Sequence, residues 1–139
     1  MSKELEGRFQ LFAKRVRDFC ARVKRDLINK EYIKQVIRSS GSVSANYTEA
    51  SDDLGKADEK MKLKISRREA KETIKWLDLI PTYENKNLEK EKLEPINEVE
   101  QIKKNIIHNY NKTRRLKECP VWEHLLLEPC SLCLIKNVY

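Results

Sequence analysis

Apolar residues recur every three or four positions through most of the chain up to Ile107, which is the spacing of one face of an α-helix. The clearest stripe lies between Arg8 and Leu27, and a short break, Asn29–Glu31, follows it. Its members are Phe9, Phe12, Val16, Phe19, Cys20, Val23 and Leu27. The pattern therefore predicts a first helix over residues 8–27.

A second helix is expected to start near Glu31, although it contains the loop-like run RSSGSVSANYTEA at residues 38–50. Its helical register is kept by Ile33, Val36, Ile37, Ser40, Val43, Ser44, Tyr47, Ala50 and Leu54. A loop would not preserve this period on both sides of the run, so we interpret it as helix. Gly41 costs about 1 kcal/mol relative to Ala in a helix. We expect the small side chains to offset that cost by letting a neighbouring helix approach closely.

Two further helices complete the pattern. The third, Ala57–Ile80, ends at Pro81, and the fourth follows Pro95 after a polar connection, Tyr83–Pro95. Their apolar stripes are Met61, Ile65, Ala70, Ile74, Leu77 and Ile80, and then Ile96, Val99, Ile102, Ile106 and Ile107. Four amphipathic helices with short connections predict an all-α, up-and-down four-helix bundle. We assign residues 1–111 to the bundle and residues 112–139 to an irregular C-terminal extension of unknown structure.

The charge balance points to a polyanionic partner. Lys and Arg number 29 against 22 Asp and Glu, a net charge of +7, and such a surplus favours nucleic acid. Basic residues recur on the first and third helices, which we take to be adjacent, and would neutralise phosphates without reading sequence. The candidate nucleic-acid-binding residues are Arg15, Arg22, Arg25, Lys64, Arg68, Lys71 and Lys75. The alternative is that both stripes are ordinary solvated faces, with acidic residues such as Asp58 and Glu59 interleaved.

Three polar residues, Arg38, Asn46 and Glu49, lie on or beside the packed side of the second helix. They could form a binding constellation. We favour a hydrogen-bonded network between helices, because polar groups placed among apolar ones must be satisfied internally. By the same reasoning, Glu69 and Glu72 are candidate partners of Arg38.

The C-terminal extension has the ligand types of a zinc site in Cys119, His124, Cys130 and Cys133, spaced C-x4-H-x5-C-x2-C. This spacing contains a single C-x-x-C pair, so we favour free thiols over a metal-linked tail and expect no metal or cofactor. The neighbouring Trp122 and Leu125–Leu127 predict a docking patch that covers the bundle or a partner.

Nothing in the pattern predicts catalysis. Gly41 stands alone, without the glycine pair and lysine of a phosphate-binding loop. His108 has no evident carboxylate or nucleophile companion. We therefore expect no enzyme and no catalytic residues. The N-terminus lacks the apolar core of a signal peptide and no run approaches a membrane span, so we expect a cytoplasmic protein with no membrane partner.

Two of these segments carry a resemblance. On the second helix, the pattern R-S-x-x-S-x-x-A-N-x-x-E-A falls on Arg38, Ser39, Val43 with flanking Ser42 and Ser44, Ala45, Asn46, Glu49 and Ala50. On the third, E-A-x-E-x-x-x-W-L falls on Glu69, Ala70, Glu72, Trp76 and Leu77. From about Leu11 to Ile107, the chain resembles the bacterial four-helix-bundle family encoded in intervening sequences of 23S rRNA genes. That family is similar to the accessory bundle protein of diversity-generating retroelements.

The resemblance implies a closed bundle that assembles as a homo-oligomer, which is a pentameric ring in the retroelement relatives. Those relatives bind nucleic acid and partner a reverse transcriptase through basic surface. Family members usually end soon after the fourth helix, whereas this chain continues. We therefore expect a non-catalytic homo-oligomer that offers a basic surface to structured RNA or an RNA–protein assembly. The rival hypothesis is a protein-interaction scaffold with no nucleic-acid role.

Overall fold

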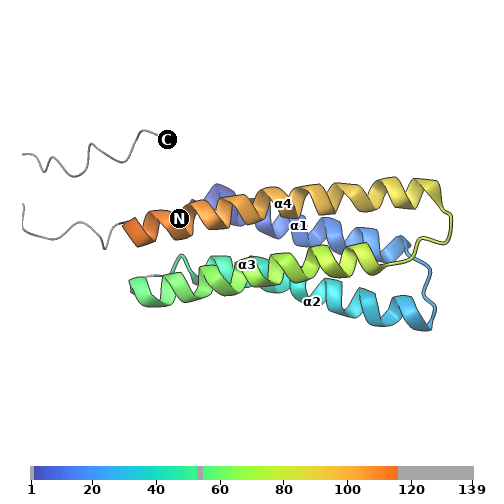
Figure 1. Ribbon diagram of the computed structural model, residues 1–139, viewed down its shortest axis with the longest axis horizontal. Coiled ribbons are helices and arrows are strands. Elements are labelled where there is room, and N and C mark those ends of the chain that lie inside the picture. Colours follow the sequence, from blue (N-terminus) through green and yellow to red (C-terminus); the bar gives the residue numbers. More distant parts are fainter. Residues whose placement is uncertain (1, 53–54, 116–139) are drawn as a thin grey trace, which may run out of the picture.

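The computed structural model describes residues 2–52 and 55–115. Four helices follow one another along the chain (Figure 1): α1 (Lys3–Arg22), α2 (Leu27–Glu49), α3 (Lys56–Leu79) and α4 (Lys86–Arg115). Each packs against the next, and α4 returns to contact α1. This is the predicted up-and-down four-helix arrangement, and the run at residues 38–50 is helical as expected.

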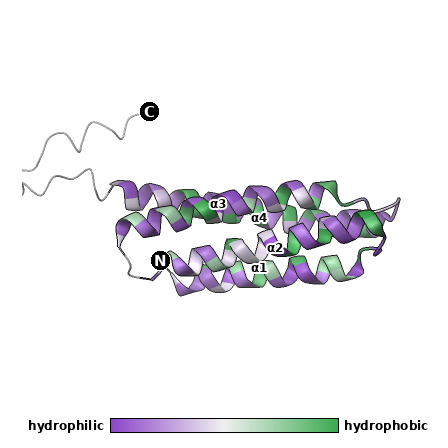
Figure 2. Ribbon diagram, turned by 90° about the horizontal axis from the view of Figure 1, so that it is seen from below, coloured by the Kyte–Doolittle hydropathy of each residue, from purple (hydrophilic) through white to green (hydrophobic). Residues whose placement is uncertain are grey.

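The core lies where the apolar stripes predict it for α1 and α4. Phe9, Phe12, Val16 and Phe19 of α1 are at most 1 % exposed, and Val99, Ile102 and Ile106 of α4 are fully buried. Figure 2 shows how hydrophobic and hydrophilic residues alternate around each helix. The stripe of α3 was only partly correct. Met61 is 58 % exposed, and the buried face instead consists of Leu63, Ser66, Ala70, Thr73 and Leu77.

The contact between α2 and α3 is the most extensive in the bundle. Small polar residues line it: the hydroxyl of the buried Ser39 on α2 lies 2.9 Å from the hydroxyl of the buried Thr73 on α3, and Ser66 of α3 is also buried. Ser66 donates a hydrogen bond to the carbonyl of Val43 at 2.8 Å. The expected close approach of small side chains is therefore found, but Gly41 takes no part in it. Gly41 is exposed, and a Cβ added there would meet no atom within 4 Å.

The first connection lies earlier than predicted. Helix α1 begins at Lys3 and ends at Arg22, and α2 starts at Leu27, where the Asp26 side chain accepts a hydrogen bond from the Asn29 amide. Asn29 is buried rather than in a break, and Leu27 is 83 % exposed rather than on the apolar face of α1. The physical reason is the Asp26 cap, because its carboxylate pairs with a free amide of the first turn and so starts a new helix at Leu27.

The fourth helix begins nine residues before Pro95, so the polar connection was predicted too long. The Asn85 side chain caps it by accepting from the Leu88 amide at 3.1 Å. A proline inside a helix costs about 3 kcal/mol, and burial of the apolar residues Leu88, Val99, Ile102 and Ile106 of α4 opposes that cost. The Lys92 ammonium lies 3.3 Å from the Ile80 carbonyl and 3.1 Å from Glu89. Helix α4 then continues to Arg115, four residues past the predicted bundle boundary at residue 111.

Candidate nucleic-acid interface

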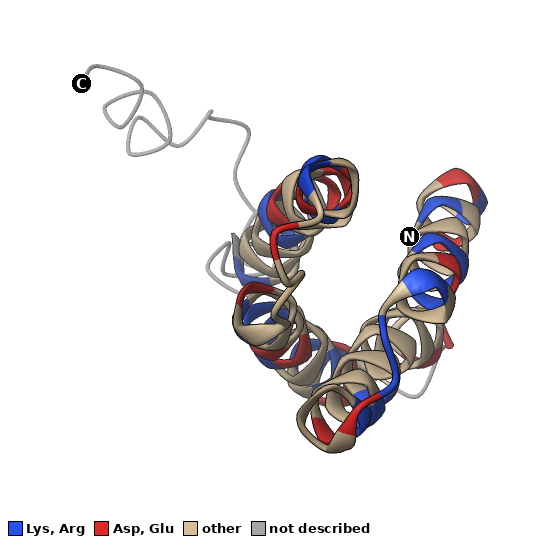
Figure 3. Cartoon of the chain, turned by 90° about the vertical axis from the view of Figure 1, so that its right-hand side faces the viewer, with Lys and Arg blue, Asp and Glu red and all other residues tan. Residues whose placement is uncertain are grey.

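The seven predicted nucleic-acid-binding residues do not share one surface. In a sequentially packed bundle α1 and α3 are separated by α2 on one side and α4 on the other, so they stand diagonally. The expectation that these two helices are adjacent was wrong. Figure 3, which looks along the bundle, shows blue and red residues mixed over the outer faces of the helices. Net charge alone therefore does not define a binding face.

Of the three predicted cations near α1, Arg22 is the one that forms an ion pair with a described residue of α4. Arg22 forms an ion pair with Glu91 at 2.8 Å. Arg15 is exposed, and its charge helps Arg8 to lower the pKa of Glu98. Arg8 itself makes two hydrogen bonds to Glu98, at 2.6 and 3.0 Å. Arg25 is exposed but belongs to the connection between α1 and α2. Two arginine–glutamate ion pairs, Arg8–Glu98 and Arg22–Glu91, therefore join α1 to α4.

The four predicted cations of α3 fall into two groups. Arg68 pairs with Glu72 at 3.3 Å, and the Lys75 ammonium lies 5.1 Å from the Trp76 ring centroid. Lys64 and Lys71 have no ion pair with any described residue. Lys64 and Lys71 thus differ from Arg22 and Arg68, which are ion-paired, and resemble Arg15, Arg25 and Lys75, which have no ion pair with a described residue.

Two further cations of α3, Lys60 and Arg67, were not among the predicted site residues but lie in line with Lys64 and Lys71. Lys60, Lys64, Arg67 and Lys71 succeed one another at intervals of four, three and four residues, which places them in one row along α3. We call this set the α3 cation row. Among the residues that the structure describes, none of its members has an acidic partner within ion-pair distance. The helical spacing was visible in the sequence, but the absence of partners depends on the fold.

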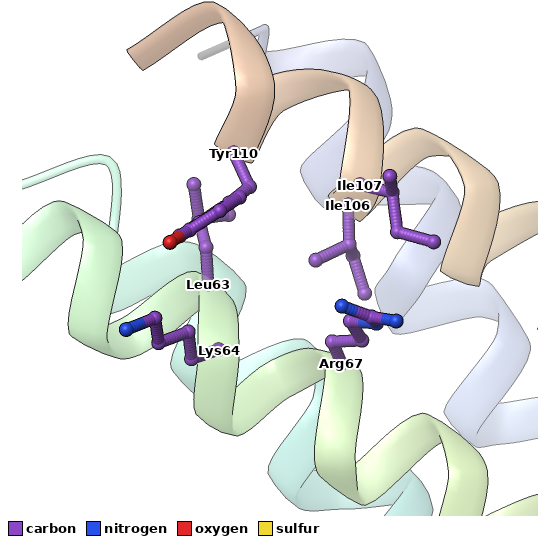
Figure 4. Close-up of a pocket in the computed structure, with 6 residues that line it drawn as sticks. All are labelled: Leu63, Lys64, Arg67, Ile106, Ile107 and Tyr110. Carbon is purple, nitrogen blue, oxygen red and sulfur yellow. The ribbon is translucent and has the colours of Figure 1, made fainter. Parts of the chain in front are cut away.

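Two members of the α3 cation row, Lys64 and Arg67, border a groove between α3 and α4 (Figure 4). This α3–α4 groove has a volume of about 100 Å³, and its lining residues are Leu63, Lys64, Arg67, Ile106, Ile107 and Tyr110. Leu63 and Ile106 form a buried floor, while Lys64 and Arg67 are exposed at its edge. The Lys64 ammonium lies 5.8 Å from the centroid of the Tyr110 ring. The groove therefore combines apolar surface with unpaired positive charge.

The structure does not bring Arg38, Asn46 and Glu49 into one network. The Asn46 side chain donates to the Ser42 carbonyl of its own helix at 2.9 Å. Glu49 forms an ion pair with Lys62 of α3. The hydrogen bonds that join helices in the interior involve other residues, among them Ser66 to Val43 and Asn109 to the Tyr47 hydroxyl at 2.7 Å.

Arg38 is exposed and lines a second, polar pocket of about 300 Å³ between α2 and α3. Glu69, Glu72 and Arg68 lie across it on α3. Partial burial and then the charge of Glu72 raise the pKa of Glu69, while Arg38 and Arg68 act in the opposite direction. The predicted proximity of Arg38 to Glu69 and Glu72 is therefore present. The mixed charges within this pocket largely compensate one another, unlike those of the α3 cation row.

Metal and thiol chemistry receive little support from the described residues. Within residues 2–52 and 55–115, no group of His, Cys, Asp or Glu is arranged to hold a metal ion. Cys20 is buried, which raises the pKa of its thiol to about 11 and keeps it protonated. Cys119, His124, Cys130 and Cys133, and the Trp122–Leu127 patch, lie outside the described residues. None of the four helices is long and apolar enough to cross a membrane within the described part of the chain.

The fold and the surface define an all-α, sequentially packed bundle with a basic groove between its last two helices. The model of the 23S rRNA-intervening sequence protein family matches residues 9–108, and the chain belongs to that family. No curated protein and no solved structure matches the chain.

Proposed function

We propose that this protein is a non-catalytic, homo-oligomeric member of its family that binds the phosphate backbone of structured RNA, alone or within an RNA–protein assembly. The single observation that carries the proposal is the α3 cation row, which has no ion-pair partner among the described residues. Four exposed or half-exposed cations along one helix edge form an electrostatic footprint for a polyanion.

The mechanism is electrostatic and independent of sequence. Lys64, Arg67 and Lys71 neutralise phosphates and release their condensed counterions, which is the main source of affinity in such contacts. Arg67 can bind one phosphate through two parallel N–H groups, whereas each lysine acts as a point charge. In a homo-oligomer the row is repeated in every copy, so avidity strengthens binding without any new contact.

The proposal differs from the prediction made from sequence in one respect. The proposed interface moves from α1 and α3 to the α3–α4 edge, because α1 and α3 are not neighbours in the bundle and Arg22 is already paired with Glu91 of α4. A cation that already has a carboxylate partner must lose that partner before it can bind a phosphate, and so contributes less net affinity.

The rival function is a protein-interaction scaffold that uses the same groove. The apolar floor of Leu63 and Ile106 favours it, because a purely phosphate-binding surface needs no apolar cavity. Binding of the purified protein to structured RNA and to duplex DNA over a series of salt concentrations separates the two functions. Affinity for RNA that falls steeply with salt supports the proposal, whereas no binding at low salt supports the scaffold.

A further inference from the structure

The α3–α4 groove has the size and the apolar lining that an aliphatic side chain requires. Its volume is about 100 Å³ and its floor is Leu63, Ile106 and Ile107. A dry apolar cavity of roughly 150 Å³ accepts a benzene-sized molecule, so this smaller groove suits a leucine rather than a tryptophan. Lys64 and Arg67 at the edge add a preference for an occupant with nearby carboxylates.

We propose that the occupant is this chain's own segment 118–128, which docks in the α3–α4 groove. The segment reads ECPVWEHLLLE and holds three consecutive leucines, Leu125–Leu127, between Glu123 and Glu128. A leucine from this triplet fills the groove, and the adjacent carboxylates face Lys64 and Arg67. Both the apolar and the electrostatic character of the segment are complementary to the groove.

The length of chain after α4 permits this contact. Tyr110 and Ile107 lie five and eight residues before the end of α4 at Arg115, or about 8 and 12 Å along the helix axis. Leu125 is ten residues beyond Arg115, so it can reach roughly 33–36 Å from the end of the helix. The exposed apolar residues Leu27 and Ile28 belong to the opposite end of the bundle. A helix as long as α4 spans about 45 Å, so the triplet falls short of that end.

Docking has a consequence for nucleic-acid binding, and this part alone rests on the proposed function. The docked segment covers two members of the α3 cation row and places acidic residues beside them. RNA and the segment then compete for one surface. If the segment covers it about nine-tenths of the time, RNA binds about tenfold more weakly than it does to a chain that lacks the segment.

A photo-cross-linking experiment tests the docking directly, without nucleic acid. A benzophenone amino acid replaces Tyr110, an aromatic residue at the edge of the groove, in the full chain, and a matched chain carries it at His108, which is exposed and does not line the groove. Irradiation of the chain with the probe at Tyr110 should yield a cross-link within one chain to residues 118–128, mapped by mass spectrometry. The same product should be lost from the His108 chain and from a chain with Leu125→Ser, Leu126→Ser and Leu127→Ser.

Three results would overturn the docking proposal: no such cross-link, equal cross-linking at both positions, or products that join two chains. The last result would identify a second copy as the occupant. A chain that ends after Arg115 provides the second arm, because it should bind RNA about tenfold more tightly. If neither chain binds RNA while the cross-link from Tyr110 persists, the docking stands and the proposed function fails.

Discussion

The hydroxyl oxygens of Ser39 on α2 and Thr73 on α3 lie 2.9 Å apart in the buried contact between these helices. Such a distance is possible because the residues around it are small, with Ser40 beside Ser39 and Ser66 and Ala70 on the facing helix. Ser39 also donates to the Val36 carbonyl at 3.2 Å, and Thr73 can donate to the Glu69 carbonyl. The contact thus stays close without leaving its hydroxyl groups unpaired.

Enlarging a side chain in this contact should destabilise the bundle. Ser66 is fully buried, so Ser66→Leu is expected to lower the free energy of unfolding by about 1–3 kcal/mol through overpacking. Ser44 is only half-buried, and Ser44→Leu should cost less. Urea denaturation of the two variants measures the difference. Equal losses would mean that the α2–α3 contact does not require small residues at Ser66.

Gly41 offers the opposite test, because the structure gives it no packing role. An added Cβ meets no atom within 4 Å, so Gly41→Ala should stabilise the protein by up to about 1 kcal/mol through helix propensity. Gly55 is the matched control. Its φ of +101° is unfavourable for any other residue, and Gly55→Ala should destabilise the protein. A loss of stability in Gly41→Ala, measured by thermal unfolding, would show that the glycine is needed.

The Arg8–Glu98 ion pair makes stability depend on pH. The hydrogen bonds from Arg8, and the charges of Arg8 and Arg15, lower the pKa of Glu98 despite its partial burial. A carboxylate with a lowered folded pKa contributes stability above its unfolded pKa of about 4.3, and this is lost as the pH falls through the folded value. We expect Glu98→Gln to lose less stability than the parent chain between about pH 5 and pH 3.

The control for this prediction is Glu94→Gln, since Glu94 is exposed and has no ion pair among the described residues. It should keep the acid sensitivity of the parent chain. Because the Arg8 side chain is 40 % exposed, the pair is worth no more than about 1 kcal/mol at neutral pH. Parallel acid profiles for the parent chain and Glu98→Gln would contradict the assignment.

The periodic pattern predicted the fold but not the ends of its helices. Hydrophobic spacing predicted the core face of α1 correctly, because its five buried apolar residues all lie on one side of the helix. It failed at Asp26 and Asn85, where a single capping side chain starts a helix and no change of hydrophobicity marks the place. It also misjudged α3, whose buried face includes Ser66 and Thr73, since these residues look polar until their partners on α2 are known.

The candidate site was predicted only in part, for a related reason. Helical spacing shows which cations share a row, and it places the predicted residues Lys64 and Lys71 in one. Whether a cation is paired depends on which helices are neighbours. Arg22 and Glu91 are 69 positions apart in the chain, and nothing in the sequence indicates their contact.

The salt dependence of RNA binding tests the central claim most directly. Each phosphate contact contributes a slope of roughly −0.9 to log K against log salt for a duplex and roughly −0.7 for a single strand. Lys64→Ala with Lys71→Ala should therefore weaken binding and flatten the slope by about two such contributions per protomer that contacts the RNA. The matched variant, Arg15→Ala with Arg25→Ala, removes the same charge from exposed residues near α1 and should leave the slope almost unchanged. Equal flattening by both pairs, or none by either, would contradict an interface at the α3–α4 edge.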